Sequence, residues 1–334
     1  MFRYFGSKAS TAPLVADIAW NGFNPVTVAD AFGGLGNMGA EFKRRGCKVT
    51  TCDLLSFPNS FQHARIVCQR TPSFSKVCTE LGVEGFSQLI EVLNIADRPS
   101  RWFIREYSEI RQFFTTENAK RIGAAWAEII RWNQRGWLSD SERKYAIASL
   151  LNSADACANT AGTYYAYLKD WHRKALKQFS MRWLPIEPGL VAGIALQGDA
   201  LQCLINKSFD LLYLDPPYNA RDYSRYYHLP ETLAKLRAVR IDAESKAGQP
   251  VQRSTHGTTI REAMRPPYLI KLIGAVHWKR LVVQYAEGAH IPMKQLSSVL
   301  DEFGDVTTYE IPAIGYRTTK GTRQQKHHVF IVDR

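Results

Sequence analysis

The sequence predicts an α/β fold in which a doubly wound, mostly parallel sheet of seven strands is interrupted by an inserted helical domain. Two observations carry this prediction. Toward both ends of the chain, apolar and β-branched stretches that stop at acids or glycines alternate with helical patterns. Between them, strand-like alternation is scarce and apolar residues recur at helical spacing. We therefore expect a sheet domain formed by residues 1–60 and 186–334, and a helical domain formed by residues 61–185.

The central strand of the sheet is expected at Phe209–Leu214, which is almost continuously apolar. It is followed by Asp215, Pro216, Pro217 and Tyr218. Because neither proline has an amide proton, the strand must end there, and Asp215 falls at its carboxyl end, where open α/β sheets bind ligands. Proline also restricts its own backbone and the residue before it. The sequence therefore predicts that the Asp215 carboxylate, the Pro216 carbonyl and the Tyr218 ring face one crevice. An ordinary strand-ending turn is the alternative.

The first strand is expected at residues 25–32, and it runs directly into a glycine-rich turn at residues 33–36 and then a helix. Glycines in such a turn let a ligand approach the backbone closely. A second strand at residues 47–53 ends in Asp53, which is placed where a ribose diol needs two hydrogen bonds. The turn lacks the full glycine spacing of a dinucleotide site. An adenosyl cofactor without a pyrophosphate therefore fits better.

A third acid, Asp199, follows the strand expected at residues 189–196. Its carboxylate is predicted either to accept the amino group of an adenine or to cap the helix expected from Leu201 to Ile205. At the start of the chain, Gly6 and Lys8 lie beside a capped helix start that could hold a carboxylate, and a plain ordered terminus is the alternative.

The remaining elements follow from periodicity and from turn-forming residues. Three further strands are expected at residues 280–285, 306–311 and 327–332, with a helix at 293–303 and a basic loop at 317–326. Helices of the inserted domain are expected at 103–114, 119–135 and 142–159, and a mobile loop is expected at 245–259.

The composition favours a polyanionic partner. The chain has 334 residues, is 45% hydrophobic and carries a formal charge of +12, which suits nucleic acid, although a basic solubility surface is the alternative. The arginines predicted to contact DNA are Arg131, Arg135, Arg221, Arg225 and Arg253. The cysteines and histidines show no metal-ligand spacing, so no metal is expected. With neither an export leader nor an apolar run of about 18 residues, a cytoplasmic protein is expected, with no membrane partner.

The order of these motifs resembles the adenine-specific DNA methyltransferases of the DNA adenine methylase family, in which the cofactor motif precedes the recognition region. The resemblance rests on Tyr4-Phe5-Gly6-Ser7-Lys8, on Asp30-Ala31-Phe32-Gly33-Gly34-Leu35-Gly36, on Asp53, on the helical insertion and on Asp215-Pro216-Pro217-Tyr218. It implies a Rossmann-like methyltransferase sheet, a target-recognition domain at residues 61–185 and double-stranded DNA as the substrate. It also implies a restriction-modification or phage setting, with a cognate restriction endonuclease as a partner.

The resemblance implies S-adenosyl-L-methionine as the methyl donor, with Asp53 on its ribose and Lys8 near its carboxylate. The implied cofactor-binding residues are Tyr4, Gly6, Lys8, Asp30, Phe32, Gly33, Gly34, Gly36, Asp53, Leu54, Asp199 and Ala200. The target adenine would be flipped out of the duplex. The implied catalytic residues are Asp215, Pro216, Pro217 and Tyr218, of which Asp215 and the Pro216 carbonyl accept hydrogen bonds from the adenine amino group and Tyr218 stacks on its ring.

Two other functions are compatible with these motifs. The first is a methyltransferase that acts on an RNA adenine or on a protein amide, because either substrate presents a planar amine to the same acceptors. A catalytically silent DNA-binding regulator on the same fold is the third hypothesis, and the intact acids Asp30, Asp53 and Asp215 argue against it.

Overall fold

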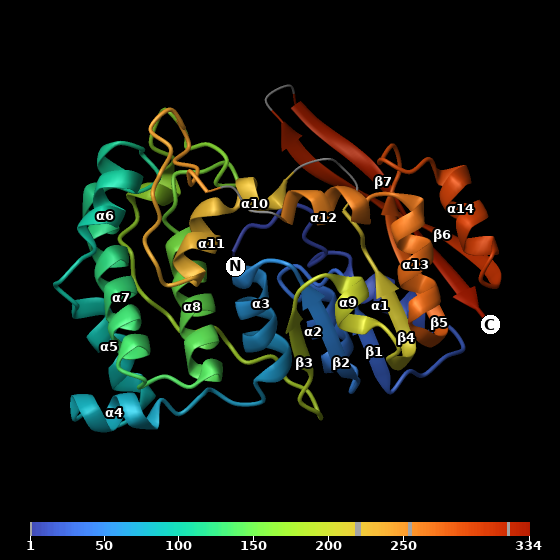
Figure 1. The fold of residues 1–334 in the computed structure, drawn as a ribbon, viewed down its shortest axis with the longest axis horizontal. Coiled ribbons are helices and arrows are strands. Elements are labelled where there is room, and N and C mark those ends of the chain that lie inside the picture. Colours follow the sequence, from blue (N-terminus) through green and yellow to red (C-terminus); the bar gives the residue numbers. More distant parts are fainter. Residues whose placement is uncertain (1, 218–221, 253–255, 319–320) are drawn as a thin grey trace. The chain divides into compact units, whose positions relative to one another are not determined.

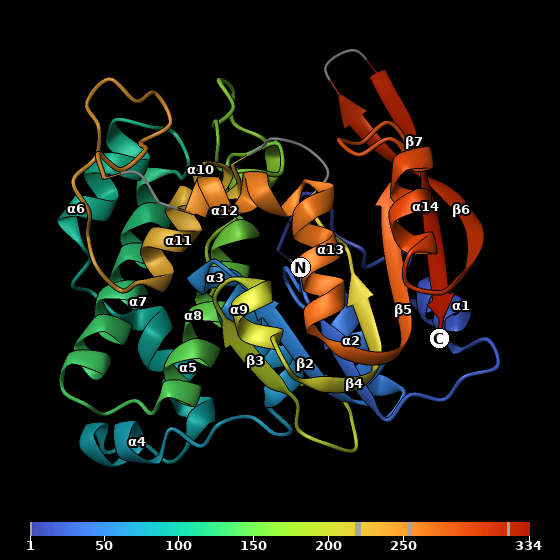
Figure 2. The ribbon, with the colours of Figure 1, turned by 45° about the vertical axis from the view of Figure 1, so that its right-hand side comes forward.

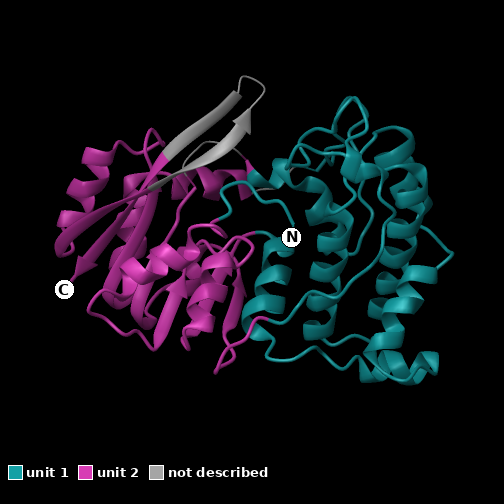
Figure 3. Ribbon diagram, turned by 180° about the vertical axis from the view of Figure 1, so that it is seen from behind, with its two compact units in different colours: residues 1–7, 55–186, 223–254 teal, residues 8–54, 187–222, 255–334 magenta. Residues whose placement is uncertain are grey.

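The computed structural model describes residues 2–217, 222–252, 256–318 and 321–334, with side chains omitted from 312 to 325. The predicted Tyr218, Arg221 and Arg253 therefore lie outside the described residues. The chain forms two compact units (Figure 3). We call the first the helical unit; it comprises Met1–Ser7, Leu55–Ile186 and Tyr223–Ser254. The second, the sheet unit, comprises Lys8–Leu54, Glu187–Asp222 and Thr255–Arg334.

The sheet unit is built on one seven-stranded sheet with the strand order β3-β2-β1-β4-β5-β7-β6 (Figure 1). The strands are β1 (Thr27–Asp30), β2 (Lys48–Asp53), β3 (Ile194–Gln197), β4 (Ser208–Leu214), β5 (His277–Ala286), β6 (Asp305–Thr318) and β7 (Gly321–Asp333). The pairs joining β3, β2, β1, β4 and β5 are parallel, whereas β7 is antiparallel to both β5 and β6. The predicted α/β class with a mostly parallel sheet is confirmed.

The order of the strands creates a switch point between β1 and β4. From β1, one connection leads outward to β2 and β3, and β4 begins the other half of the sheet. In the register, Asp30 lies opposite Thr51 of β2 and Tyr213 of β4. Asp30, Asp53 and Asp215 therefore come from three neighbouring strands at their carboxyl ends, which is where ligands bind in open α/β sheets.

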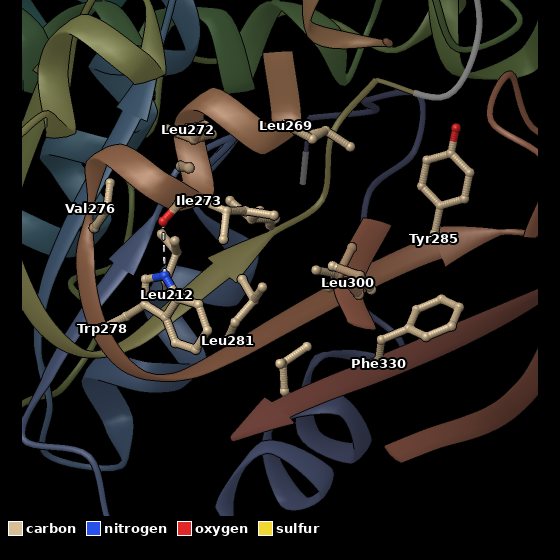
Figure 4. Close-up of a cluster of buried hydrophobic side chains, with 14 of the residues drawn as sticks. Leu212, Leu269, Leu272, Ile273, Val276, Trp278, Leu281, Tyr285, Leu300 and Phe330 are labelled. Carbon is tan, nitrogen blue, oxygen red and sulfur yellow. Dashed lines mark hydrogen bonds between the residues drawn. The ribbon is translucent and has the colours of Figure 1, made fainter. Parts of the chain in front are cut away.

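Helices cover both faces of the sheet. Helices α9 (Ala200–Leu204), α13 (Pro266–Ala275) and α14 (Met293–Asp301) share one apolar cluster with β4, β5 and β7. Figure 4 shows part of this cluster, to which Leu269, Leu272 and Ile273 of α13 and Leu212 and Leu281 of the sheet belong. In Figures 1 and 2, α9 and α13 lie side by side in front of the strands. Helix α12 (His256–Ala263) precedes α13.

The opposite face is packed by α1 (Ala12–Trp20) and α2 (Asn37–Arg44). The Phe42 ring of α2 is buried between Trp20, on which it stacks at 5.6 Å, and Tyr213 of β4, which it meets edge-on at 5.6 Å. Because helices pack on both faces of the sheet's central strands, the acids at the carboxyl ends are held on a rigid frame.

The helical unit is organised around α7 and α8. Its α-helices are α3 (Ser56–Gln62), α4 (Ser75–Leu81), α5 (Phe86–Ile95), α6 (Arg101–Ile104), α7 (Thr116–Gln134), α8 (Asp140–Asp155), α10 (Tyr223–Tyr226) and α11 (His228–Ala234). Short π or 3₁₀ turns lie at His63–Val67, Arg105–Glu109 and Arg173–Leu176. Helix α8 begins at a capping box in which Ser139 and Glu142 satisfy each other's backbone amides. The indole of Trp126, in α7, donates to the Leu233 carbonyl of α11.

Several predicted boundaries were wrong. The helix expected at 103–114 ends by Glu109, because the chain turns back and the Phe114 amide bonds the Tyr107 carbonyl. The strand expected from residue 189 begins at Ile194. The last two strands form the antiparallel hairpin that the sequence indicates, but their pairing continues through the loop expected at 317–326 as far as Thr318 and Gly321. Helix α12 occupies part of the loop expected at 245–259.

The helical unit also takes in two segments outside residues 61–185. Its first segment, residues 2–5, is fixed by three backbone amides: Phe2 donates to Asn152 Oδ1 at 2.8 Å, Arg3 donates to Asp155 Oδ2 at 3.2 Å, and Phe5 donates to the Tyr227 hydroxyl at 2.6 Å. The other is Tyr223–Ser254, which carries α10 and α11.

Candidate active site

Asp30 ends β1 and is the most deeply buried of the acids at the carboxyl edge of the sheet. Its side chain is 1% exposed, and among the described residues neither carboxylate oxygen has a hydrogen-bond partner. Burial, and then the charges of Asp215 and Asp53, raise the pKa of Asp30 to about 7, whereas the nearby Gly39 amide and the charge of Lys8 act to lower it. A buried acceptor of this kind is costly unless a ligand satisfies it. Asp30 is therefore suited to a cationic or donor group of a cofactor.

Asp215 follows β4 and forms an ion pair with Lys8. Lys8 Nζ lies 2.5 Å from Asp215 Oδ2, and the two side chains are 4% and 14% exposed. Two prolines follow Asp215: Pro216 is buried and Pro217 is half-buried. Because proline restricts the backbone, the chain is held rigidly where the strand ends. Sequence reasoning assigned Lys8 to the cofactor site and Asp215 to catalysis, and it did not foresee that the two side chains contact each other.

The glycine turn lies between β1 and α2. The Gly33 amide donates to the Cys52 carbonyl of β2 at 2.9 Å, and the Gly36 amide donates to the Gly33 carbonyl at 2.7 Å. Gly36 occupies the cap position of α2 with φ +73°, a left-handed conformation that side chains rarely adopt. Phe32 and Gly34 complete the turn, and Gly34 also has a positive φ of +51°. The turn thus presents backbone rather than side chains beside Asp30.

Asp199 caps α9, which confirms the capping alternative. Its Oδ1 accepts the Gln202 amide at 3.2 Å, and its Oδ2 accepts the Tyr268 hydroxyl at 2.7 Å. The Tyr268 ring lies 6.5 Å from that of Phe32. Sequence reasoning missed Tyr268, which reaches this place from α13; the proline pair at the start of that helix marked a helix start but no function.

The second acid, Asp53, is half-buried at the end of β2, where its carbonyl accepts the Gly198 amide at 2.9 Å. Leu54 follows it, half-buried, and Ala200 is a buried residue in the first turn of α9. The sheet unit thus brings together most of the predicted cofactor-binding residues.

Two predicted cofactor residues belong to the helical unit. Tyr4 stacks on Tyr227 at 5.0 Å, and its carbonyl accepts the Ser7 amide at 3.1 Å in a turn that contains Gly6. Gly6 has a φ of +78°, which favours glycine. The assignment of Tyr4 and Gly6 to the cofactor site stays a prediction.

The predicted DNA-contacting arginines that are described also lie in the helical unit. Arg131 is half-buried and paired with Glu128 of the same helix. Arg135 is exposed at the end of α7, with its guanidinium 4.7 Å from the Trp137 ring centre. Arg225 is exposed in α10 and lies 5.9 Å from the Tyr165 ring centre. Their contact with DNA stays a prediction.

The described part of the chain shows neither a metal site nor a membrane-spanning helix. No group of three or more histidine, cysteine, aspartate or glutamate side chains among them could hold a metal ion. Within the same residues, no helix is both long enough and apolar enough to cross a membrane.

Strand order, the glycine turn after β1 and the acids that end β1, β2 and β4 define a Rossmann-like methyltransferase fold. Residues 4–266 match the family of D12 class N6 adenine-specific DNA methyltransferases, and the chain belongs to that family.

Curated relatives agree with this assignment. The chain is 28% identical to the type II methyltransferase M.FokI of Planomicrobium okeanokoites, over 97% of this chain and 50% of the relative. It is 26% identical to the modification methylase LlaI of Lactococcus lactis subsp. lactis, over 94% of this chain and 51% of the relative. Identity to the type II methyltransferase M.NlaIII of Neisseria lactamica is 26%, over 98% of this chain and 95% of the relative. The chain therefore spans about half the length of M.FokI and LlaI but nearly all of M.NlaIII.

Proposed function

We propose that the chain is a site-specific DNA methyltransferase that moves a methyl group from S-adenosyl-L-methionine to the exocyclic amino group of a flipped-out adenine in duplex DNA. The observation that carries this proposal is the placement of Asp215 and Pro216 at the end of the central strand, beside the buried Asp30. Family membership supports the reaction class.

The residues at the sheet edge fit the proposed cofactor. Asp30 offers two buried carboxylate oxygens that need a donor, which suits the ammonium group of a methionine moiety. The turn at residues 33–36 allows close approach of a ligand to the backbone, and Asp53 would accept hydrogen bonds from a ribose diol. S-adenosyl-L-methionine, when bound there, supplies an electrophilic methyl group on a sulfonium.

The catalytic work of the chain is positioning and polarisation. An adenine amino group has two protons, and the Asp215 carboxylate and the Pro216 carbonyl are the two proposed acceptors for them. Accepting both hydrogen bonds makes the amino nitrogen more pyramidal and its lone pair more available for in-line attack on the methyl group. The rigid proline backbone keeps these acceptors in place before the substrate arrives, which is where most of the rate gain of such a site arises.

Asp53→Ala tests the cofactor site separately. We expect it to weaken S-adenosyl-L-methionine binding by about 1–3 kcal/mol, the scale of a hydrogen bond to a charged group, because the ribose loses its acceptor. Duplex DNA affinity measured without cofactor should change little. Calorimetry with the cofactor and a DNA binding titration measure the two effects. Unchanged cofactor affinity with lost DNA binding would show that the end of β2 has another role.

A surface of the helical unit suits a phosphate backbone. We call residues 165–177 the basic segment; Lys169, Arg173 and Lys177 are exposed there, and Asp170 is its one acid. Several basic residues elsewhere in the helical unit have an acidic partner, as Arg121 has in Glu117 and Arg131 has in Glu128. No ion pair of Lys169, Arg173 or Lys177 occurs in the described part of the chain. Unpaired cations gain most from a phosphate counterion.

The backbone of the basic segment is irregular but firmly held. Asn159 donates to the carbonyls of Gln112 and Leu168 and accepts the His172 amide. Asn118 donates to the carbonyls of Ala175 and Lys177 in the same way. These hydrogen bonds from two buried asparagine side chains hold the backbone of the basic segment in one conformation. A surface loop that is held in this way is suited to binding, and we propose that the exposed side chains of the basic segment contact DNA.

Salt dependence tests this surface. Replacing Lys169, Arg173 and Lys177 with Gln should make the log-log slope of duplex binding against salt shallower by about two to three units, since each phosphate contact contributes about 0.9. Arg131→Gln/Arg135→Gln should change the slope by about one unit or less, because Arg131 already has a counterion in Glu128. Arg121→Gln, which removes a cation paired with Glu117, is the matched control. Equal slopes in the triple variant and the wild type would place DNA elsewhere.

The biological setting is proposed from the relatives, which are named type II methyltransferases and modification methylases. On that basis we propose a restriction-modification role, with a cognate restriction endonuclease as the functional partner and the cytoplasm as the location. Protection of host DNA from digestion, compared in cells with and without the chain, tests this role.

A further inference from the structure

Lys8 is a buried cation whose backbone is fixed independently of its side chain. Its carbonyl accepts the Thr11 and Ala12 amides at 3.0 and 2.8 Å, which are the first hydrogen bonds of α1. Helix α1 is anchored in turn by Val15, Ala16 and Ala19, whose side chains are fully buried. The ammonium group is therefore delivered to Asp215 from a rigid support rather than from a free terminus.

The carboxylates around Lys8 repel one another. Asp30 of β1 and Asp53 of β2 belong to the same edge as Asp215, and the charges of Asp215 and Asp53 both raise the pKa of Asp30, whereas Lys8 lowers it. Neighbouring carboxylates favour uptake of a proton by one of them. A protonated carboxyl donates from one oxygen, whereas an ionised carboxylate only accepts.

Two further groups complete the surroundings. Tyr213 of β4 is buried, and its hydroxyl donates to Gln284 Oε1 at 2.6 Å, so it remains neutral. His327 of β7 is also buried; burial, and then the charge of Lys8, lowers its pKa to about 4, which keeps it neutral near pH 7. Of these groups, Lys8 is the cation that contacts Asp215.

We propose that Lys8 is a positioning residue for Asp215, which it keeps ionised and correctly oriented so that the carboxylate acts only as an acceptor toward the substrate amine. This role rests on the proposed function. It differs from the role in the cofactor carboxylate site that the motif order implies, because it acts on the chemical step rather than on cofactor affinity. It also explains why a buried ion pair lies at a site that could otherwise have used a neutral acceptor.

Kinetics of Lys8→Met and Lys8→Arg test the proposal. Lys8→Met should lower kcat by about 100-fold, the scale of a lost preorganised electrostatic contact, with the KM for S-adenosyl-L-methionine changed less than about threefold. The acidic limb of its kcat profile against pH should move to higher pH, because Asp215 loses its cation. Lys8→Arg, which keeps the charge, should recover most of the rate.

A lysine paired with an acid at the other end of β4 provides the matched control. Lys279 of β5 lies 2.7 Å from Asp210, at the opposite end of β4, and is 72% exposed. Lys279→Met should leave kcat and its pH profile unchanged. If Lys8→Met instead raises the cofactor KM about tenfold or more and leaves kcat near the wild-type value, Lys8 serves the cofactor carboxylate and the proposal is wrong.

Stability distinguishes failure of this inference from failure of the proposed function. Lys8→Met should lower the melting temperature of the full chain, because it leaves the Asp215 charge buried without its cation. Adding Asp215→Asn to that variant should restore most of the loss. This comparison of melting temperatures does not depend on methyl transfer. It therefore tests the ion pair even if the wild type methylates no duplex. Additive losses in the double variant would overturn the pairing on which the proposal depends.

Discussion

Asp215→Asn should reduce methyl transfer to duplex DNA by about 100-fold or more, the loss seen when one preorganised polar contact to a reacting group is removed. The amide keeps the size of the side chain but replaces one acceptor oxygen with a donor, which cannot bond an amine proton. Cofactor affinity should survive, because Asp215 is not among the proposed cofactor ligands. Single-turnover transfer of a labelled methyl group and cofactor calorimetry measure the two quantities.

Asp210→Asn is the control for this variant, because Asp210 lies on the same strand at the other end. Its carboxylate accepts the amides of Val26 and Thr27 and pairs with Lys279, so its loss should cost stability but not transfer per folded molecule. Near-normal turnover of Asp215→Asn would remove Asp215 from the catalytic role.

Asp30→Asn should have opposite effects on stability and on function. Burial raises the pKa of Asp30 to about 7, from 3.8. The folded state therefore holds the proton more tightly than the unfolded chain, and the stability associated with it is fully present below pH 3.8 and lost as the pH rises to about 7. At pH 8 the asparagine variant, which needs no ionisation, should be more stable than the wild type by a few kcal/mol. This gain should shrink between pH 7 and pH 4.

The same substitution should weaken S-adenosyl-L-methionine binding by about 10- to 100-fold, the scale of a lost hydrogen bond to a charged group. Denaturant unfolding at pH 8 and pH 5, with cofactor calorimetry, tests both effects. Asp53→Asn is the comparison, because Asp53 is only half-buried and should lose cofactor affinity without a stability gain. A stability difference between Asp30→Asn and wild type that does not change with pH would contradict the assignment.

The acids at the ends of β1, β2 and β4 could be predicted from the sequence, because each ends a strand-forming run; a glycine turn follows Asp30 and a proline pair follows Asp215. Strand ends of this kind are local signals. The face and edge on which they meet follow from the parallel register, which places Asp30 opposite Tyr213. The order of strands, turns and acids along the chain was therefore enough to predict most of the sheet unit.

Contacts between distant residues could not be predicted in this way. Lys8 and Asp215 are 207 positions apart, and Tyr268 reaches Asp199 across 69. Neither contact leaves a local pattern. The α6 region was misassigned for a related reason: the apolar spacing of residues 103–114 is helical, but the hydrogen bond from Phe114 to Tyr107 ends the helix early. Tertiary packing decides such boundaries, so spacing alone could not place them.

The central claim is tested most directly by identifying the methylated base. The wild-type chain is incubated with labelled S-adenosyl-L-methionine and unmethylated duplex DNA, and the digested nucleosides are separated. We predict label in the N6-methyl-2′-deoxyadenosine of the DNA, lost in Asp215→Asn and retained in Asp210→Asn. Label in cytosine, in RNA supplied in parallel or in protein, or no label in any nucleoside, would contradict the assignment of adenine methylation to this site.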